Sequence, residues 1–105
     1  MLSIYPVSLQ VRRDVAGIFR VVAQVDRNLA DQLRRAATSV PLNLAESDGM
    51  SGGNRRQRRL SALGSAREVV ACLDVAEAMG YARIDGVVRA RLDHVIGVLV
   101  RVARA

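Results

Sequence analysis

Four arginines occupy five consecutive positions in the segment SGGNRRQRRLSALGSARE, which covers residues 51–68. They are Arg55, Arg56, Arg58 and Arg59, and they follow closely after a pair of glycines. A guanidinium group presents planar donors that match phosphate oxygens in pairs, so arginines at this density are suited to binding an anion. The free backbone donors of the glycine turn would add to the attraction for phosphate at the start of a helix.

The position of these arginines relative to the expected core does not fit a helix face that points away from the core into solvent. Arg56 lies four residues before Leu60 and seven before Leu63, at spacings that continue the apolar stripe of the same helix. Arg59 lies four residues before Leu63 and continues the stripe too, while the other two arginines flank it. Cations at a helix N-terminus are unfavourable by about 0.3–1 kcal/mol each, which suggests compensation by a partner. Nucleic acid, another subunit or acidic protein, and solvent all stay open as the environment of the cluster.

The overall charge agrees with an anionic partner. All 16 basic residues are arginine, and 10 acidic residues leave a net charge of +6. Such a charge attracts nucleic acid without specifying its sequence. Only 3% of the chain is aromatic and no aromatic residue accompanies the cluster, so we expect readout of phosphate and shape instead of base stacking. Weaker candidates for phosphate contact are Arg12, Arg13, Arg34 and Arg35.

The sequence offers little for catalysis. A di-iron centre in a helical bundle needs two Glu-x-x-His pairs, but the chain has one histidine, His94, and the residue three before it is Arg91. Cys72 lies on an expected helix without a charged or glycine-rich setting that would activate it. We find no P-loop, dinucleotide fingerprint or zinc-type cysteine spacing. We therefore expect no enzymatic activity, no cofactor, no metal and no small-molecule substrate.

The cellular setting is predicted from the cysteine count and the apolar runs. A single cysteine cannot form an internal disulfide, which fits a reduced compartment. The N-terminal stretch MLSIYPVSLQ lacks the basic start and long apolar run of a signal peptide. The apolar run at residues 95–100 is too short to span a bilayer. The expectation is a soluble, cytoplasmic protein without a membrane partner.

Four amphipathic helices must position these residues. Asn28, with Asp31 three residues on, predicts a variant of the capping box at the start of the second helix. Gly80 is well placed as the C-terminal stop of the third. Short connections favour an all-α, antiparallel up-down four-helix bundle as the single domain of residues 1–105, with no sheet. Apolar residues recur at helical spacing over residues 8–25, 28–46, 54–79 and 88–102.

Pro41 interrupts the second of these segments. A proline inside a helix removes one backbone donor and pushes against the preceding turn, so a kink is expected near Pro41. Thr38, Ser39 and Asn43 surround it, and their side chains could bond to freed backbone groups. In the alternative, the helix ends at Val40 and a new short helix begins with Pro41 at its first position.

Two segments carry a family resemblance. DQLRRAATSVPLNLAES (residues 31–47) and ALGSAREVVACLDVAEAMGY (residues 62–81) resemble, in order and spacing, the four-helix bundle family that includes proteins encoded in 23S rRNA intervening sequences. That family is similar in fold to the accessory protein of diversity-generating retroelements, a homopentamer that associates with a reverse transcriptase and nucleic acid. The resemblance implies a four-helix bundle, assembly as a homopentamer, and RNA or a ribonucleoprotein such as a reverse transcriptase as partner.

The motif residues of both segments are interpreted as structural. Ala36 and Ala37, together with Gly64 and Ser65, would let two helix backbones approach closely. Polar motif positions would join Arg34, Arg35 or Arg67 in a hydrogen-bonded or ionic cluster that fixes register. The structural motif positions are Pro41, Asn43, Glu46, Gly64, Ser65 and Glu68.

Self-association is expected on three grounds. A chain of 105 residues leaves much apolar surface for a partner subunit, and Val69, Val75 and Val98 lie off the main apolar stripes. The family resemblance is the third ground, and it alone implies the number five.

Overall fold

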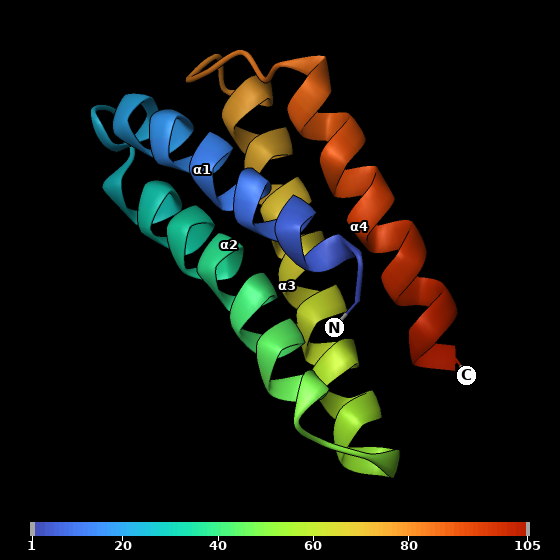
Figure 1. The fold of residues 1–105 in the computed structure, drawn as a ribbon. Helices are drawn as coiled ribbons and strands as arrows, with labels where there is room; N and C mark the ends of the chain where they lie inside the picture. Colours follow the sequence, from blue (N-terminus) through green and yellow to red (C-terminus); the bar gives the residue numbers. More distant parts are fainter. Residues whose placement is uncertain (1, 105) are drawn as a thin grey trace.

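A computed structural model describes residues 2–104, which form four α-helices and, over that range, no strand (Figure 1). The sequence-based expectation of an all-α, four-helix protein is confirmed. Helices α1 and α3 each contact both α2 and α4, so the four helices enclose a common core. They are α1 (Ile4–Ala23), α2 (Arg27–Asp48), α3 (Gly52–Ala78) and α4 (Gly86–Arg104).

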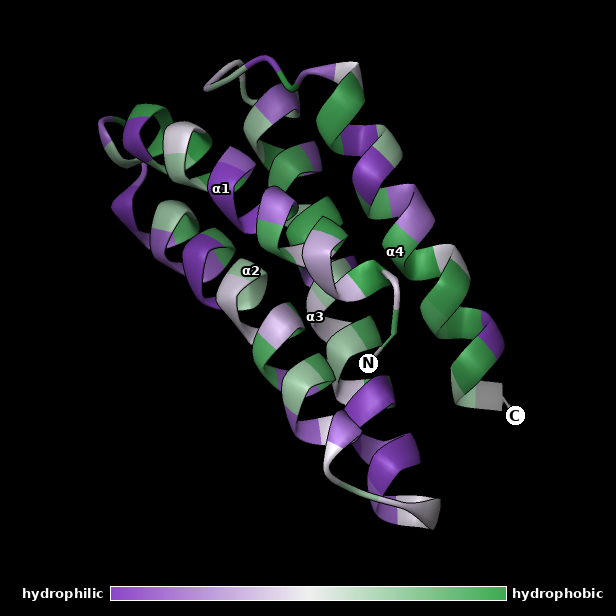
Figure 2. Cartoon of the chain, viewed as in Figure 1, coloured by the Kyte–Doolittle hydropathy of each residue, from purple (hydrophilic) through white to green (hydrophobic). Residues whose placement is uncertain are grey.

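The two ends of the molecule differ. The α1–α2 and α3–α4 connections lie together at one end, and the α2–α3 connection lies at the other (Figure 1). At that second end, the last turns of α2 and the first turns of α3 extend beyond α1 and α4. The first turns of α3 are strongly hydrophilic there, in contrast to the apolar stretches of α4 (Figure 2). The arginine cluster therefore lies where α3 has fewer helical neighbours.

The core consists of two apolar clusters, one toward each end of the bundle. Leu33, Leu73 and Leu92 belong to the first cluster, while Leu44 and Leu99 belong to the second. Each of these leucines is at most 1% exposed. Burying a leucine side chain contributes about 1.5–3 kcal/mol, so these periodic positions supply much of the folding free energy.

The start of α2 differs from its prediction. Asp26 is the N-cap, and its side chain accepts a hydrogen bond from the Leu29 amide at 2.9 Å. The capping box predicted from Asn28 is therefore wrong, because a carboxylate two residues earlier already satisfies a free amide of the first turn. Asp31 instead pairs with Arg27 at 3.3 Å, one helical turn away.

Two other helix starts also lie earlier than predicted. Helix α1 begins at Ile4, and Pro6 is tolerated in its first turn because a missing amide proton breaks no helical bond there. Helix α3 begins at Gly52, whose φ of 58° is easily adopted without a Cβ. The predicted end of α3 is confirmed, since Gly80 has a φ of 72° and its amide donates to the Glu77 carbonyl oxygen at 3.0 Å.

Helix α2 runs without interruption through Pro41. The alternative of a helix ending at Val40 is therefore wrong. The Thr38 hydroxyl donates to the Arg34 carbonyl oxygen, and the Asn43 amide donates to the Ser39 carbonyl oxygen, each at 2.9 Å. Neither acceptor is the Ala37 carbonyl that the missing Pro41 amide proton frees, so the expected bonds to freed backbone groups are not the ones these side chains form. A kink at this proline stays a prediction.

The α2–α3 contact uses only some of the expected small residues. Ala36 and Ala37 are buried, whereas Gly64 is exposed and a Cβ built on it would meet nothing within 4 Å. The interpretation of Gly64 as a point of close backbone approach is therefore wrong within one chain. Ser65 does connect the two helices, because its hydroxyl donates to the Ser39 hydroxyl at 2.8 Å.

The three valines expected on a self-association surface do not share one environment. Val69 is fully buried in the first core cluster, so it is not available to a partner. Val75 is 45% exposed and Val98 is partly buried. The off-stripe position of Val69 was misleading because α3 packs against both α2 and α4 and needs two apolar faces.

Candidate nucleic-acid interface

A groove between α2 and α3 brings together arginines that are distant in sequence. It has a volume of about 350 Å³, and we call it the basic groove. Arg34 and Arg35 come from the middle of α2, and Arg58 comes from the start of α3. Three of the eight arginines predicted to contact nucleic acid thus share one surface. The basic groove is lined by Arg34, Arg35, Thr38, Ser39, Leu42, Asn43, Glu46 and Arg58.

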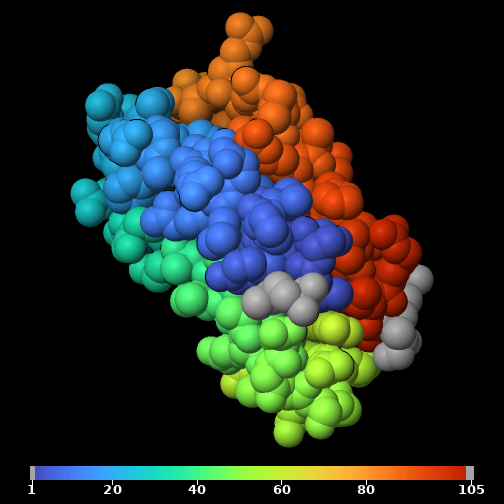
Figure 3. Space-filling view, viewed as in Figure 1, coloured from blue at the N-terminus to red at the C-terminus, as the bar shows by residue number. Residues whose placement is uncertain are grey.

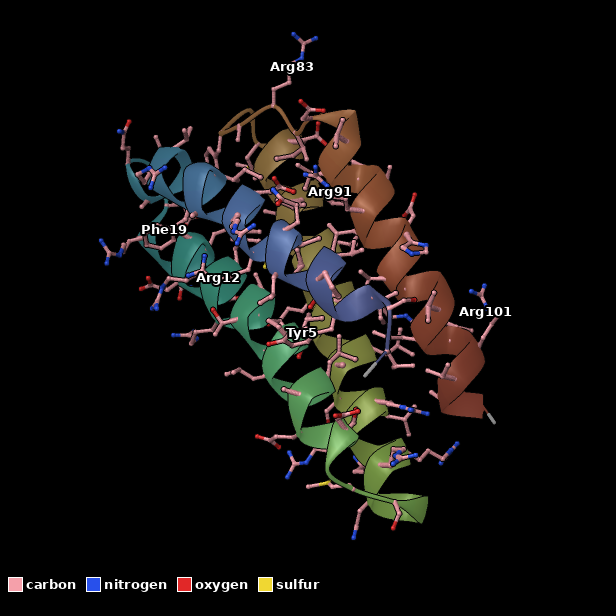
Figure 4. The ribbon with its side chains drawn as sticks, viewed as in Figure 1. Tyr5, Arg12, Phe19, Arg83, Arg91 and Arg101 are labelled. Atoms are coloured by element: carbon pink, nitrogen blue, oxygen red, sulfur yellow. The ribbon has the colours of Figure 1, made fainter. Side chains whose placement is uncertain are left out.

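Helix α1 supports the α2 side of the basic groove. Arg12 extends from α1 toward α2 (Figure 4), where its Nε donates to the Thr38 hydroxyl at 2.8 Å. This bond places a fourth predicted arginine beside the groove. Arg13, the next residue, is exposed and bonds to Gln10 on its own helix, so it is not tied to the groove.

The cations of the basic groove are only weakly neutralised. Arg58 lies 3.1 Å from Glu46, but the two side chains are 43% and 52% exposed, and exposed pairs of this kind contribute about 0–1 kcal/mol. Arg34 is 3.9 Å from Asp31 and lies over the Phe19 ring, 5.7 Å from its centroid. Arg35 is exposed and has no ion pair within residues 2–104. These guanidinium groups keep donors for an anionic ligand.

Neutral polar groups lie between the arginines of the basic groove. The Asn43 amide donates to the Ser39 hydroxyl at 2.9 Å, and Ser65 donates to the same hydroxyl. The ionic cluster expected to include Glu68 is wrong in this form, because Glu68 is exposed and has no ion pair in the described part of the chain. The polar contact between α2 and α3 is made instead through Ser39, which was not among the predicted structural positions.

The other arginines at the start of α3 are divided among different contacts. The Nε of Arg55 donates to the Met50 carbonyl oxygen at 2.7 Å, and that of Arg56 donates to the Ala103 carbonyl oxygen at 2.8 Å. Ala103 lies in the last turn of α4, where carbonyl groups are free and a cation is favourable. This contact explains why Arg56 continues the apolar stripe. Arg59 is half-buried.

Several other arginines form ion pairs that connect two helices. Arg91 on α4 reaches Asp14 on α1 at 2.7 Å (Figure 4). Arg89 on α4 pairs with Asp74 at 2.8 Å and with Glu77, both on α3. The hydrogen bond from Arg89, followed by one from the Ile84 amide, lowers the pKa of Glu77 below its ordinary value. Arg89 and Arg91 are thus engaged in ion pairs between helices, whereas several weakly paired arginines converge in the basic groove.

Cys72 is poorly placed for nucleophilic chemistry. It is buried in the first core cluster, and this burial, with a smaller effect of Glu68, raises the pKa of its thiol. A thiol with a raised pKa is protonated near neutral pH and is a weak nucleophile. His94 is exposed on α4. Over residues 2–104, no group of three or more histidine, cysteine or acidic side chains is arranged to hold a metal ion.

A second surface was missed by the sequence analysis. Pro6 and Val7 of α1 and Val87 and Ala90 of α4 line an open, mostly apolar groove of about 540 Å³, with Gln10, Arg91 and His94 at its margins. We call it the apolar groove. Figure 3 shows the face on which α1 lies between α2 and α4. The apolar groove has no clear pattern in the sequence, because α1 and α4 are distant along the chain and each contributes few residues to it.

Fold and site together define a small all-α protein of four helices with a basic groove. Within the described residues, none of the helices is long and apolar enough to cross a membrane. The chain belongs to the family described as 23S rRNA-intervening sequence protein, which it matches over residues 2–96. The match covers all of α1, α2 and α3 and about half of α4. No curated protein matches the chain. The predicted family is confirmed.

Proposed function

We propose that this protein is a non-catalytic RNA-binding protein that holds RNA along the basic groove, alone or within a ribonucleoprotein. The observation that carries this proposal is the convergence of Arg34, Arg35 and Arg58 from two helices on one groove. The family description, with its reference to 23S rRNA, supports RNA as the anionic partner. The net charge of +6 favours the same class of ligand.

The chemistry of the basic groove favours contact with phosphates over recognition of bases. Guanidinium groups bind phosphate oxygens in pairs, and three of them along one groove match a run of backbone phosphates. Arg12 is held beside them by Thr38. No aromatic residue lines the groove, so stacking of bases contributes little. Ser39 and Asn43 add hydrogen-bonding groups that a ribose hydroxyl can meet.

The proposed active form is a homo-oligomer of up-down antiparallel bundles, each bent at Pro41, with five copies as the number implied by the family resemblance. The apolar groove is the surface we assign to a second copy. Val87 in this groove is 53% exposed, and a small chain gains stability by covering such a side chain. The basic groove lies on α2 and α3, so self-association through α1 and α4 leaves it open.

A protein-interaction module without nucleic-acid binding is the second candidate function. It is favoured by one observation, the extent of the apolar groove, which would suit a helix of a different protein equally well. In that case Arg58 and Glu46 would serve only as an exposed ion pair. The two candidates differ in whether RNA binds at low salt.

Size-exclusion chromatography with light scattering, run with and without an RNA mixture, tests the proposal. We expect a particle whose mass is a constant multiple of 11.4 kDa. It should take up RNA at about 50 mM salt and release most of it at about 200 mM or above, because phosphate binding releases counterions. An oligomer that ignores RNA at both salt concentrations would overturn the proposal and favour the interaction module.

A further inference from the structure

A second polar pocket lies at the end of the bundle, where α2 ends and α3 begins. Its volume is about 300 Å³, and it is separate from the basic groove, since no residue lines both. It is more enclosed than that groove, and polar groups make up most of its lining. We call it the end pocket. Its lining residues are Leu2, Ser47, Asp48, Arg55 and Arg59.

Arg59 has an unsatisfied donor at the end pocket. Its Nε is buried and has no hydrogen-bond partner, and the side chain has no ion pair with any residue in 2–104. A buried donor of a charged group that bonds to nothing is costly, and folded proteins rarely keep one without a ligand or water. The guanidinium group of Arg59, which lines the end pocket, therefore has no acceptor of its own among the described residues, and its remaining nitrogens are the ones that a ligand in the pocket can meet.

Arg55 presents a second guanidinium group to the same pocket. Its Nε is held by the Met50 carbonyl oxygen at 2.7 Å, which fixes the planar group and leaves its terminal nitrogens for another acceptor. Ser47 offers no donor, because its hydroxyl already donates to the Leu44 carbonyl oxygen at 2.7 Å. Donors to a ligand in this pocket would thus come from the two arginines.

We propose that the end pocket binds a phosphate group that carries at most one ester bond. Such a group carries about −1.5 to −2 charges and three acceptor oxygens, which suits two guanidinium groups better than the single charge of a phosphodiester. Asp48 lines the pocket too and places a negative charge beside the two arginines. This carboxylate opposes the anion and keeps the pocket from holding phosphate very tightly. The ligand is either free phosphate or the terminal phosphate of an RNA.

If the phosphate group belongs to an RNA, this inference rests on the proposed function and deepens it. The basic groove would then hold internal phosphates of the RNA, and the end pocket would hold its terminal phosphate. The two are tested separately. Inorganic phosphate probes the end pocket without RNA. A pair of RNA oligonucleotides of one sequence, with a 5′-phosphate or a 5′-hydroxyl, probes the chain end.

The experiment measures phosphate binding by calorimetry at constant ionic strength for the full chain, Arg59→Gln and Arg83→Gln. Arg83 points away from the bundle on the α3–α4 connection (Figure 4), so its variant matches the loss of charge. We expect Arg59→Gln to weaken phosphate binding at least about tenfold and Arg83→Gln to leave it unchanged. The 5′-phosphate should improve RNA binding severalfold in the full chain and in Arg83→Gln only.

Equal phosphate affinity in Arg59→Gln and the full chain, or no binding by either, would mean that water fills the end pocket and would overturn the inference. Phosphate binding without any RNA binding would support the end pocket and remove the proposed function. RNA binding that ignores the terminal phosphate, with phosphate binding intact, would assign the pocket to free phosphate. If Arg59→Gln does not fold, Arg55→Gln gives the same comparison.

Discussion

Replacing Arg34, Arg35 and Arg58 together by glutamine is expected to lower the affinity for single-stranded RNA about 100-fold at 0.1 M salt. For single-stranded RNA, each phosphate contact contributes about 0.7 to the slope of log K against log salt concentration. Losing three contacts therefore reduces the slope by about 2, which corresponds to about two decades of affinity at 0.1 M salt. The three side chains line the basic groove, and only Arg58 forms an ion pair across helices. Helix content and oligomer size should therefore stay unchanged.

A matched control separates the basic groove from net charge. Arg20, Arg83 and Arg101 are exposed and lie outside the groove, and Arg101 points away from α4 in Figure 4. Changing these three to glutamine also reduces the net charge from +6 to +3. Fluorescence anisotropy with labelled RNA at several salt concentrations should show nearly the full affinity for this control. Equal losses in both triple variants would mean that RNA responds to overall charge and not to the groove.

Replacing Leu44 by alanine is expected to lower the free energy of unfolding by about 2–5 kcal/mol. Leu44 is 1% exposed in the second core cluster, so truncation removes buried apolar surface and leaves a cavity between helices. Small domains are stable by only about 5–15 kcal/mol, so this loss is a large fraction of the total. Urea unfolding followed by circular dichroism measures the change.

Leu42→Ala is the control for the core prediction. Leu42 lies on the same helix two residues earlier and is 58% exposed, so its replacement should change the free energy of unfolding by no more than about 0.5 kcal/mol. A comparable loss for both leucines would mean that Leu42 is covered in the folded protein, as it would be at a subunit interface. A small loss for Leu44 would contradict the core described above.

The helices were predictable because their apolar residues recur at helical spacing, which is the period of a buried helical face. Their starts were less predictable, because they depend on single side chains. Asp26 caps α2 by accepting from Leu29, and Pro6 is tolerated in the first turn of α1. Sequence spacing alone did not distinguish Asp26 from Asn28 as the cap.

The candidate site was predictable in composition but not in arrangement. The four adjacent arginines of α3 suggested one patch, yet Arg56 turns to the end of α4 and Arg58 to Glu46 on α2. Which arginines share a groove depends on how α2 and α3 face each other, and this is set by the buried residues packed between the two helices. For the same reason, no spacing in the sequence indicated that Arg34 and Arg58 line one surface.

The most direct test of RNA binding at the basic groove is photo-crosslinking to an RNA that contains 4-thiouridine, followed by mass spectrometry of the crosslinked peptides. We expect crosslinks in the middle of α2, near residues 34–43, and in the first turns of α3 around Arg58. They should disappear in the triple glutamine variant of the basic groove. Crosslinks confined to α1 and α4, or none at a concentration where RNA binds, would contradict the assignment of RNA to this groove.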